Sequence, residues 1–289
     1  MSAFLNAELD AITAIVLDAL GPVRAAADAA PDSAALTFLL RQYLASDRGD
    51  LRDALGDALA PAFACADAET RSLERAAWLT LFAEASAISD DERLLAAAGA
   101  LVADLRRAWP STTIVGHGMA SVDACLRAAD LVDPHDLVPA AIDELERLVG
   151  QAYQPGDGIA HTLHPGHAPA RVRGGLADHA RSASALITAF EISGRLPYAM
   201  LAEELMQTAR RGADSVPDFA ARCEACRALC RLAALHRDEA YRAAAVVAPD
   251  AAYLVDAEEM LMALSSEALA RESGAGVYGL ALGEWLGLR

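Results

Sequence analysis

Apolar residues recur every three or four positions along most of the chain, and this spacing is typical of amphipathic helices. One clear stripe runs along residues 176–191 and consists of Leu176, Ala180, Ala183, Leu186, Ile187 and Phe190. The same spacing predicts an N-terminal amphipathic helix and six helix pairs. The pairs are expected at 34–46 and 50–60, 72–88 and 91–108, 118–132 and 135–151, 176–193 and 197–211, 219–236 and 238–247, and 256–271 and 277–287.

Short polar turns interrupt the helical pattern at a regular interval. They lie at Asp47, Asp90, Asp133, Gly194 and Arg237, with spacings of 43, 43, 61 and 43 residues. A period of this length that is filled by two helices indicates an array of helix hairpins. Six hairpins can close into a ring in which the first helices of the pairs form a parallel inner layer. We therefore predict an all-α fold, an α/α toroid of about six helix hairpins, as one domain over residues 1–289.

The long interval contains one stretch in which helical spacing gives way to alternation. Between Gly158 and Arg173, Ile159, His161 and Leu163 alternate with residues 160, 162 and 164, Pro165-Gly166 provides a turn, and residues 170–173 alternate again. This pattern is typical of a β-hairpin. Because an isolated hairpin is unstable in water, we expect it to lie against the helices, over the end of the ring where the helix at 176–193 begins.

Closure of the ring brings the starts of the inner helices to one mouth, together with their unpaired N–H groups and positive dipole ends. Candidate chemistry is therefore expected among the polar residues near these starts. The catalytic candidates are Asp178, His161 and His117, and the ligand-binding candidates are His164, His179, Arg222 and Glu224. We expect His117, His161, Asp178 and Arg222 to lie at the same end of the toroid.

Each of these candidates also has a purely structural interpretation. Asp178 follows Gly174-Gly175, where a carboxylate can cap the free N–H groups of a helix. Alternatively, it faces the cavity and works with a histidine as a general acid or base. For His117, between Gly116 and Gly118, the same two interpretations apply: it caps the helix or it has a functional role. Histidine is the natural proton carrier here because its pKa lies near neutral pH.

Charge and composition exclude several classes of function. The chain has 41 acidic against 24 basic residues, a net charge of −17, so it repels nucleic acids and anionic membranes at long range. The basic residues are all arginine, and the absence of lysine excludes a Schiff-base lysine, a pyridoxal-phosphate lysine and a P-loop lysine. The N-terminus lacks a basic n-region, and no apolar run reaches membrane-spanning length. We expect a cytoplasmic protein with no nucleic-acid or membrane partner.

Two clusters, one of histidines and one of cysteines, contain residue types that bind metal ions. His161, His164 and His167 lie three residues apart, and imidazole suits zinc, copper or iron, but they also fit a solvated rim or an acid–base role. Cys223, Cys226 and Cys230 lie along one helix stripe, where free cysteine behaves as a small buried apolar residue. We expect neither a metal nor another cofactor.

Several segments resemble a known family. Residues 174–212, GGLADHARSASALITAFEISGRLPYAMLAEELMQTARRG, resemble a helix pair in the α/α-toroid part of the thioredoxin-domain-containing proteins of the spermatogenesis-associated-protein-20 type. Leu176, Asp178, His179 and Ala180 match the family's Leu-x-Asp-(Tyr/Gln/His)-Ala helix start. GDGIAHTLHPG resembles the family's hairpin, RLAALHRDEAYRAAA a later repeat, and His117-Gly118 stands where the family has Asn-Gly. Met1 to Pro31 reads as helix without cysteine, so we expect no thioredoxin domain in this chain.

This resemblance implies a carbohydrate-handling ancestry, because the family's toroid is similar to six-hairpin glycosidases and N-acylglucosamine 2-epimerases. Two functions remain open. One is a sugar isomerase, epimerase or glycosidase-like protein that takes a small carbohydrate at a polar pocket of the inner-helix mouth. The other is a noncatalytic helical-repeat scaffold for protein interaction, favoured by an aromatic content of only 5%. The sequence does not decide whether the chain is an enzyme.

Protein purified without chelator should contain no stoichiometric zinc, iron or copper, because the cysteine stripe is expected in the core and the histidines at a rim. Elemental analysis tests this. One equivalent of metal that disappears when His161 or Cys226 is substituted would contradict both interpretations.

Overall fold

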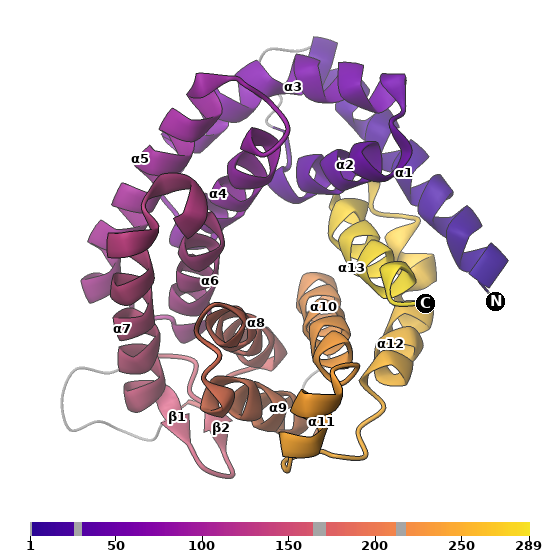
Figure 1. Cartoon of the computed structure of the whole chain (residues 1–289). Helices are drawn as coiled ribbons and strands as arrows, with labels where there is room; N and C mark the ends of the chain where they lie inside the picture. Colours follow the sequence, from indigo (N-terminus) through magenta and orange to yellow (C-terminus); the bar gives the residue numbers. More distant parts are fainter. Residues whose placement is uncertain (1, 26–30, 164–171, 212–217) are drawn as a thin grey trace.

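Two concentric layers of helices form a ring (Figure 1) in the computed structural model, which describes residues 2–25, 31–163, 172–211 and 218–289. The inner helices are α2 (Ser33–Ser46), α4 (Ser72–Ser86), α6 (Val115–Val132), α8 (Leu176–Ser193), α10 (Phe219–Leu235) and α13 (Gly276–Gly287). The outer helices are α1 (Ser2–Ala25), α3 (Gly49–Ala68), α5 (Glu92–Ala108), α7 (Pro134–Ala152), α9 (Leu196–Arg211), α11 (Glu239–Ala244) and α12 (Tyr253–Ala268). Two short 3₁₀ turns lie at Trp109–Ser111 and Glu272–Ala275.

The inner ring is closed. Each inner helix contacts the next in chain order, and α13 contacts both α10 and α2. Along the α2–α13 seam, Gly276 lies against Ala35 and Gly283 against Gln42. Because the residue numbers rise together on both helices, α2 and α13 run in the same direction. The predicted all-α toroid is confirmed.

The sixth helix pair departs from the prediction. We expected its first helix, at 256–271, in the inner ring, but the corresponding α12 lies in the outer layer and α13 lines the axis. The sequence of α13, GVYGLALGEWLG, explains this placement because its small residues let the backbone approach α2 closely. The inner ring is therefore closed by the last helix of the chain, and the N-terminal α1 packs outside it against α13.

The turns of the repeat end the inner helices as expected. Asp47 and Gly194 adopt left-handed backbone conformations, with φ of 51° and 68°, after α2 and α8. Asp133 and Asp238 then cap the following outer helices by accepting hydrogen bonds from free N–H groups. Left-handed C-caps and aspartate N-caps together explain why short polar turns mark the period.

The outer helix α3 is longer than predicted. It continues to Ala68, whereas the prediction ended it at residue 60, before Pro61. A proline within a helix lacks the N–H that would bond to the preceding turn. Ala58, Ala62 and Ala66 are nevertheless buried against the core, and this packing keeps the helix continuous past the proline.

The predicted hairpin is present in part and begins earlier than expected. β1 (Tyr153–Gln154) pairs antiparallel with β2 (Gly158–Ile159). The chain also returns along β2 as predicted, because the His161 N–H donates to the Val172 carbonyl oxygen at 2.9 Å. The predicted turn at Pro165-Gly166 lies outside the described residues.

The segment after β2 also joins two inner helices. The Leu163 N–H donates to the Thr113 carbonyl oxygen at 2.7 Å, and the Val115 N–H donates to the His161 carbonyl oxygen at 2.9 Å. Since Val115 begins α6 and the chain continues to α8, this segment lies at the starts of neighbouring inner helices.

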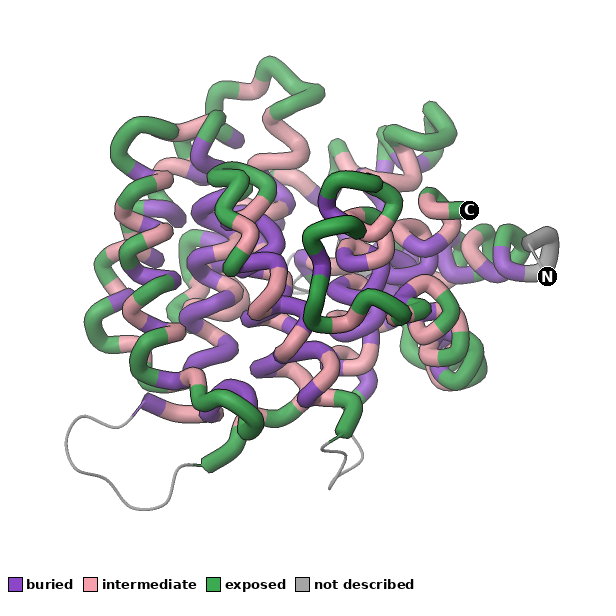
Figure 2. Tube along the Cα trace, turned by 60° about the horizontal axis from the view of Figure 1, so that its bottom comes forward, coloured by how far each residue is buried: buried purple, intermediate pink, exposed green. Residues whose placement is uncertain are grey.

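The hydrophobic core lies between the two layers, and buried stretches concentrate inside the ring while the turns are exposed (Figure 2). The largest fully buried side chains include Trp285, Tyr253, Tyr278, Phe38 and Phe82. None of the described helices combines the length and the apolar character needed to cross a membrane.

Gly276→Ala should destabilise the protein by about 1–3 kcal/mol, the usual effect of overpacking. A Cβ at Gly276 would lie 2.6 Å from the Ala35 Cα, so the α2–α13 seam would have to open. Urea unfolding measures the loss. Gly283→Ala on the same helix is the matched control, because its Cβ meets no atom closer than 3.8 Å and alanine favours helix. Equal stability of the two variants would contradict this account of ring closure.

Candidate functional site

Asp178 joins three segments at the mouth formed by the inner-helix starts. One carboxylate oxygen accepts a hydrogen bond from the Gly175 N–H at 2.9 Å and lies 2.9 Å from His161 Nδ1. The other accepts from the Gly116 N–H at 3.3 Å. Asp178 is buried, whereas the His161 side chain is 45% exposed. The carboxylate therefore caps α8, ties α6 to it and orients the exposed imidazole.

His117 completes a cluster with these two residues. It is half-buried in the first turn of α6, and burial, together with the positive charge of Arg181, lowers its pKa. Asp178 and His161 also act on it electrostatically. The structure thus brings His117, His161 and Asp178 to the same end of the ring. Their catalytic roles stay predictions.

The position of His179 argues against the predicted ligand-binding role. This side chain is 1% exposed, and both ring nitrogens are occupied. Nδ1 lies 2.9 Å from the Gly175 carbonyl oxygen, and Nε2 lies 3.4 Å from the Ile159 backbone nitrogen. Burial lowers the pKa of His179, which favours a neutral ring that donates from Nδ1 and accepts at Nε2. His179 fastens β2 to α8 instead.

The remaining ligand-binding candidates do not lie together in the structure. Arg222 lies in the first turn of α10, at the same end of the ring as Asp178, but it donates to Glu267 of α12 at 2.6 Å, so its guanidinium faces the outer layer. Glu224 faces the axis, where it accepts from Arg181 at 2.9 Å. The two differ because residues two positions apart point about 200° apart around a helix. His164 lies outside the described residues.

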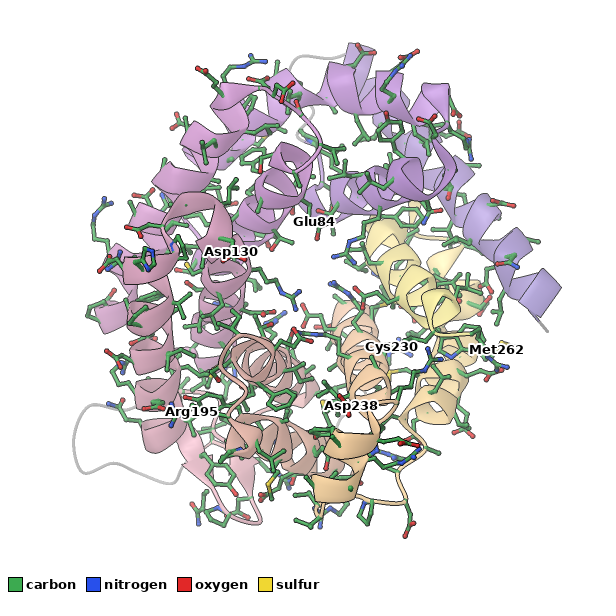
Figure 3. The ribbon with its side chains drawn as sticks, viewed as in Figure 1. Glu84, Asp130, Arg195, Cys230, Asp238 and Met262 are labelled. Carbon is green, nitrogen blue, oxygen red and sulfur yellow. The ribbon has the colours of Figure 1, made fainter. Side chains whose placement is uncertain are left out.

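A cavity of about 200 Å³ lies within the inner ring and is lined by residues from all six inner helices. Figure 3 shows side chains of these helices, including Glu84, gathered around the axis. Among the described lining residues, the charged ones are five arginines and three carboxylates. They are Arg41, Arg127, Arg181, Arg227, Arg231, Asp123, Glu224 and Glu284.

The sequence repeat places these charges in layers. Five positions with the spacings of the turns, 43, 43, 61 and 43 residues, are Arg41, Glu84, Arg127, Thr188 and Arg231. One helical turn earlier, the same spacings relate Thr37, Thr80, Asp123, Ser184 and Arg227. Two bonds between neighbouring helices confirm the layering, because Arg41 donates to Glu84 at 2.7 Å and Arg231 to Thr188 at 2.9 Å.

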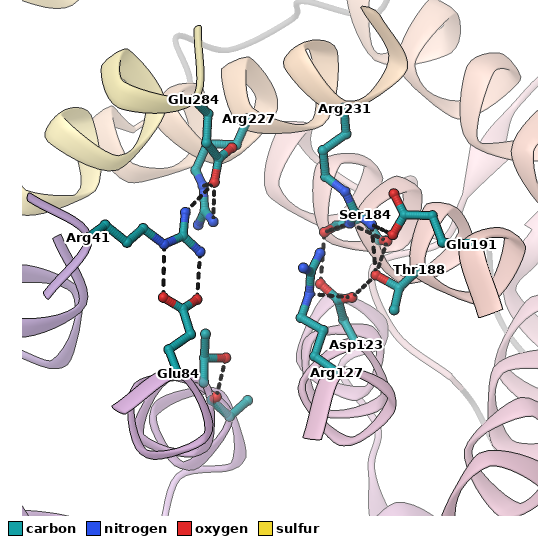
Figure 4. Close-up of polar contacts among 12 residues, drawn as sticks. Arg41, Glu84, Asp123, Arg127, Ser184, Thr188, Glu191, Arg227, Arg231 and Glu284 are labelled. Carbon is teal, nitrogen blue, oxygen red and sulfur yellow. Dashed lines mark hydrogen bonds and ion pairs between the residues drawn. The ribbon is translucent and has the colours of Figure 1, made fainter. Parts of the chain in front are cut away.

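One polar network closes the ring across α13 (Figure 4). Arg41 donates to both carboxylate oxygens of Glu84, at 2.9 and 2.7 Å, and to Glu284 at 2.7 Å. Arg227 of α10 donates to the same Glu284 oxygen at 2.7 Å. Helices α2, α4, α10 and α13 are thereby connected through four side chains.

A second network joins α6, α8 and α10 (Figure 4). Asp123 accepts hydrogen bonds from the hydroxyls of Ser184, at 2.8 Å, and Thr188, and it pairs with Arg127 at 3.0 Å. Arg231 donates to the Ser184 and Thr188 hydroxyls at 2.9 Å each. The two hydroxyls therefore connect the carboxylate of α6 to the guanidinium of α10.

Two carboxylates of the cavity differ in acidity. Burial by itself would raise the pKa of Asp123, but Arg127, Arg231 and the two hydroxyls outweigh it and hold the pKa at about 2. Burial also raises the pKa of Glu224, and there the Arg181 partner offsets only part of the effect. The cavity thus combines an ionised carboxylate with one that holds its proton more strongly.

Most of these axial residues were absent from the sequence-based candidates, which were sought at the helix starts. Glu224 was included, whereas Asp123, Arg127 and Arg231 lie one or more turns further along their helices. The signal that could have identified them is the repeat itself. Applying its spacings to charged helix positions, and not only to the turns, selects the residues that face the axis.

The cysteine stripe is part of the core. Cys223, Cys226 and Cys230 are buried, and burial raises the pKa of the Cys223 thiol to about 12. In the part of the chain that the structure describes, no group of three or more His, Cys, Asp or Glu side chains is arranged to hold a metal ion. His164 and His167 lie outside that part.

Solved structures with the same architecture are carbohydrate-active enzymes. An unsaturated glucuronyl hydrolase from Bacillus sp. GL1 matches with a TM-score of 0.74 and 13% identity over 100% of this chain and 97% of its own. An unsaturated glucuronyl hydrolase specific for heparin gives 0.71 and 12% over 98% of both chains. An α-1,6-mannanase of Salegentibacter sp. HEL1_6 gives 0.66 and 10% over 89% and 88%. At these identities the similarity establishes the fold alone, an α/α toroid.

Comparisons at the level of sequence are negative. No protein-family model matches the chain, and no characterised protein sequence gives a significant match.

The low pKa of His179 predicts a measurable pH dependence of stability. A histidine in the unfolded chain titrates near 6.5, above the folded value, so the unfolded chain binds more protons between the two values. Stability should therefore fall as the pH drops from about 6.5 through the folded pKa. His179→Gln should show a shallower fall, because glutamine offers a donor and an acceptor but does not titrate.

Urea unfolding midpoints at several pH values test this. His135→Gln is the control, because His135 is exposed, and it should keep the wild-type slope. Identical pH dependence in wild type and His179→Gln would contradict the assignment of His179 as a buried neutral tether.

Proposed function

We propose that this protein binds a small carbohydrate in the axial cavity and acts on it through acid–base groups of the inner helices. The observation that carries the proposal is a charged cavity lined by all six inner helices, in a fold whose solved neighbours are named for carbohydrate substrates. The resemblance of residues 115–245 to the spermatogenesis-associated-protein-20 type supports the same assignment.

The size of the cavity suits one sugar unit. An engineered protein cavity of about 150 Å³ admits a six-membered ring. The axial cavity measures about 200 Å³, so a single pyranose with its hydroxyl groups is the expected occupant. Arginine, carboxylate and hydroxyl groups around it match the hydrogen-bonding groups of a sugar.

The two cavity carboxylates supply complementary chemistry. Cleavage of a glycosidic bond needs one carboxyl group that donates a proton and one carboxylate that stays ionised. Glu224, whose pKa is raised, suits the first role, and Asp123, whose pKa is held at about 2, suits the second. We assign Glu224 as general acid and Asp123 as the ionised partner.

The mouth offers a second acid–base set. His161 is exposed, and Asp178 acts through it as a positioning residue, with both carboxylate oxygens already bonded. Asp178 precedes Arg181 by three residues, about 4.5 Å along α8, so the mouth adjoins the cavity. His161 and His117 would carry the proton if the reaction is an isomerisation or epimerisation.

One observation favours a noncatalytic scaffold instead. The described lining contains no aromatic side chain for stacking against a sugar. Its carboxylates also pair with arginines, so the charges can serve ring closure alone. The two functions predict opposite outcomes in a ligand screen.

A panel of neutral, N-acetylated and acidic monosaccharides and their glycosides should contain members that raise the melting temperature. A ligand at about one hundred times its Kd stabilises the folded state by about 2.7 kcal/mol. A flat response across the panel would overturn the proposal and favour the scaffold.

Substitutions then show whether the reacting groups lie in the cavity or at the mouth. Glu224→Gln should abolish turnover if the cavity carboxylates react, whereas His161→Gln and Asp178→Asn should do so if the mouth reacts. Glu146→Gln is the matched control, because Glu146 pairs with Arg195 at 2.7 Å in the outer layer. Loss of folding in Asp178→Asn would show that this carboxylate is chiefly a cap, and His161→Gln would then decide the question.

A further inference from the structure

We infer that the occupant of the axial cavity is an acidic monosaccharide whose carboxylate binds between Arg127 and Arg231. This inference rests on the proposed carbohydrate function and adds the charge of the ligand. The carboxylate would receive hydrogen bonds from the terminal nitrogens of Arg127.

The cavity concentrates arginine in a chain that is acidic overall. Acidic residues exceed basic ones by 41 to 24 in the sequence, yet five arginines and three carboxylates line the cavity among the described residues. Glu84 and Glu191, beside this lining, pair with Arg41 and Arg231. The charges are therefore matched, and a ligand would be recognised by guanidinium donors that these pairs leave free.

The terminal nitrogens of Arg127 are available as hydrogen-bond donors to a ligand. Its Nε donates to Asp123 at 3.0 Å, while its two terminal nitrogens make no hydrogen bond within the described parts of the chain. Its side chain is 36% exposed, more than that of Asp123, Glu224 or Glu284, although helices surround it. Arg127 lines the cavity, so its terminal N–H groups are accessible to a ligand there.

Arg231 holds a second positive charge close to the first. Its terminal nitrogens are anchored on the hydroxyls of Ser184 and Thr188. The Thr188 hydroxyl donates to Asp123 and accepts from Arg231, so the Arg231 guanidinium lies close to the pair formed by Asp123 and Arg127. Burial, followed by the like charge of Arg127, lowers the pKa of Arg231.

Among the described lining residues, Asp123 is the carboxylate that interacts with both arginines. Arg231 has a second partner in Glu191, at 2.7 Å. Arg127 is therefore the arginine that keeps free donors, and a ligand carboxylate would bind to it beside Asp123.

The size of the cavity favours a carboxylate over a phosphate. Guanidinium groups bind both carboxylates and phosphates through paired hydrogen bonds, so hydrogen bonding alone does not separate them. A uronic acid replaces the terminal CH₂OH of a hexose by a carboxylate of similar size, whereas a sugar phosphate adds a whole group to a ring that already fills a cavity of about 200 Å³.

Calorimetric titration of the full chain tests the inference with D-glucuronate and D-galacturonate, the neutral sugars D-glucose and D-galactose, glucose 6-phosphate, and acetate. At least one uronate should bind ten times more tightly than its neutral counterpart, and acetate should bind far more weakly. Equal affinity for uronate and neutral sugar would overturn the inference but leave the proposed function intact. Tighter binding of the phosphate, or acetate binding as tight as the uronate, would also overturn it.

The variant Arg127→Gln should weaken uronate binding at least tenfold and neutral-sugar binding less than twofold, and Arg127→Lys should give an intermediate loss. Arg147→Gln is the control, because Arg147 pairs with Glu144 within the outer helix α7 and should leave both affinities unchanged. A similar loss for both sugars in a folded Arg127→Gln would contradict a specific carboxylate contact. Absence of binding by every sugar would instead refute the proposed function itself.

Discussion

Closure of the inner ring is the constraint on which the rest of the structure depends, and it is achieved by ion pairs that join its first and last helices. Arg41 of α2 pairs with Glu84 of α4 and Glu284 of α13, and Glu284 also accepts from Arg227 of α10. Removing one partner from such a group leaves an uncompensated charge away from bulk water, which is costly. Small residues on α13 permit the close approach that these pairs require.

Closure of the inner ring also creates the axial cavity. Six parallel helices around an axis cannot fill their centre with the small side chains present at many inward positions, such as Ala77 and Ala120. Charged side chains therefore extend into the space and pair across the seams, where water or a ligand can complete their hydrogen bonds. The same set of residues therefore closes the ring and forms the lining of the cavity, and Arg127 is the member whose terminal nitrogens have no hydrogen bond within the described parts of the chain.

The structure brings three of the sequence-based candidates together at the predicted end of the ring, and the charged residues that line the axial cavity lie deeper. Asp178, His161 and His117 meet at the mouth, but Asp178 is buried and bonded on both oxygens, so it acts through His161. The side chains of His179 and Arg222 are bonded instead to neighbouring segments, β2 and α12. Whether a helical residue points to the axis or to the outer layer depends on a rotation of about 100° per residue, which motif matching at a helix start does not resolve.

The sequence by itself determined the helices, their pairing and their period, because apolar spacing, aspartate caps and left-handed turn residues are local properties of the chain. It also determined the equivalence of positions such as Arg41, Glu84 and Arg127, which share the repeat spacing. Only the tertiary structure decided that α13 and not α12 lines the axis, since that choice depends on contact between helices at opposite ends of the chain. The acidity of Asp123 and Glu224 was likewise decided there, because it depends on burial and on arginines from neighbouring helices.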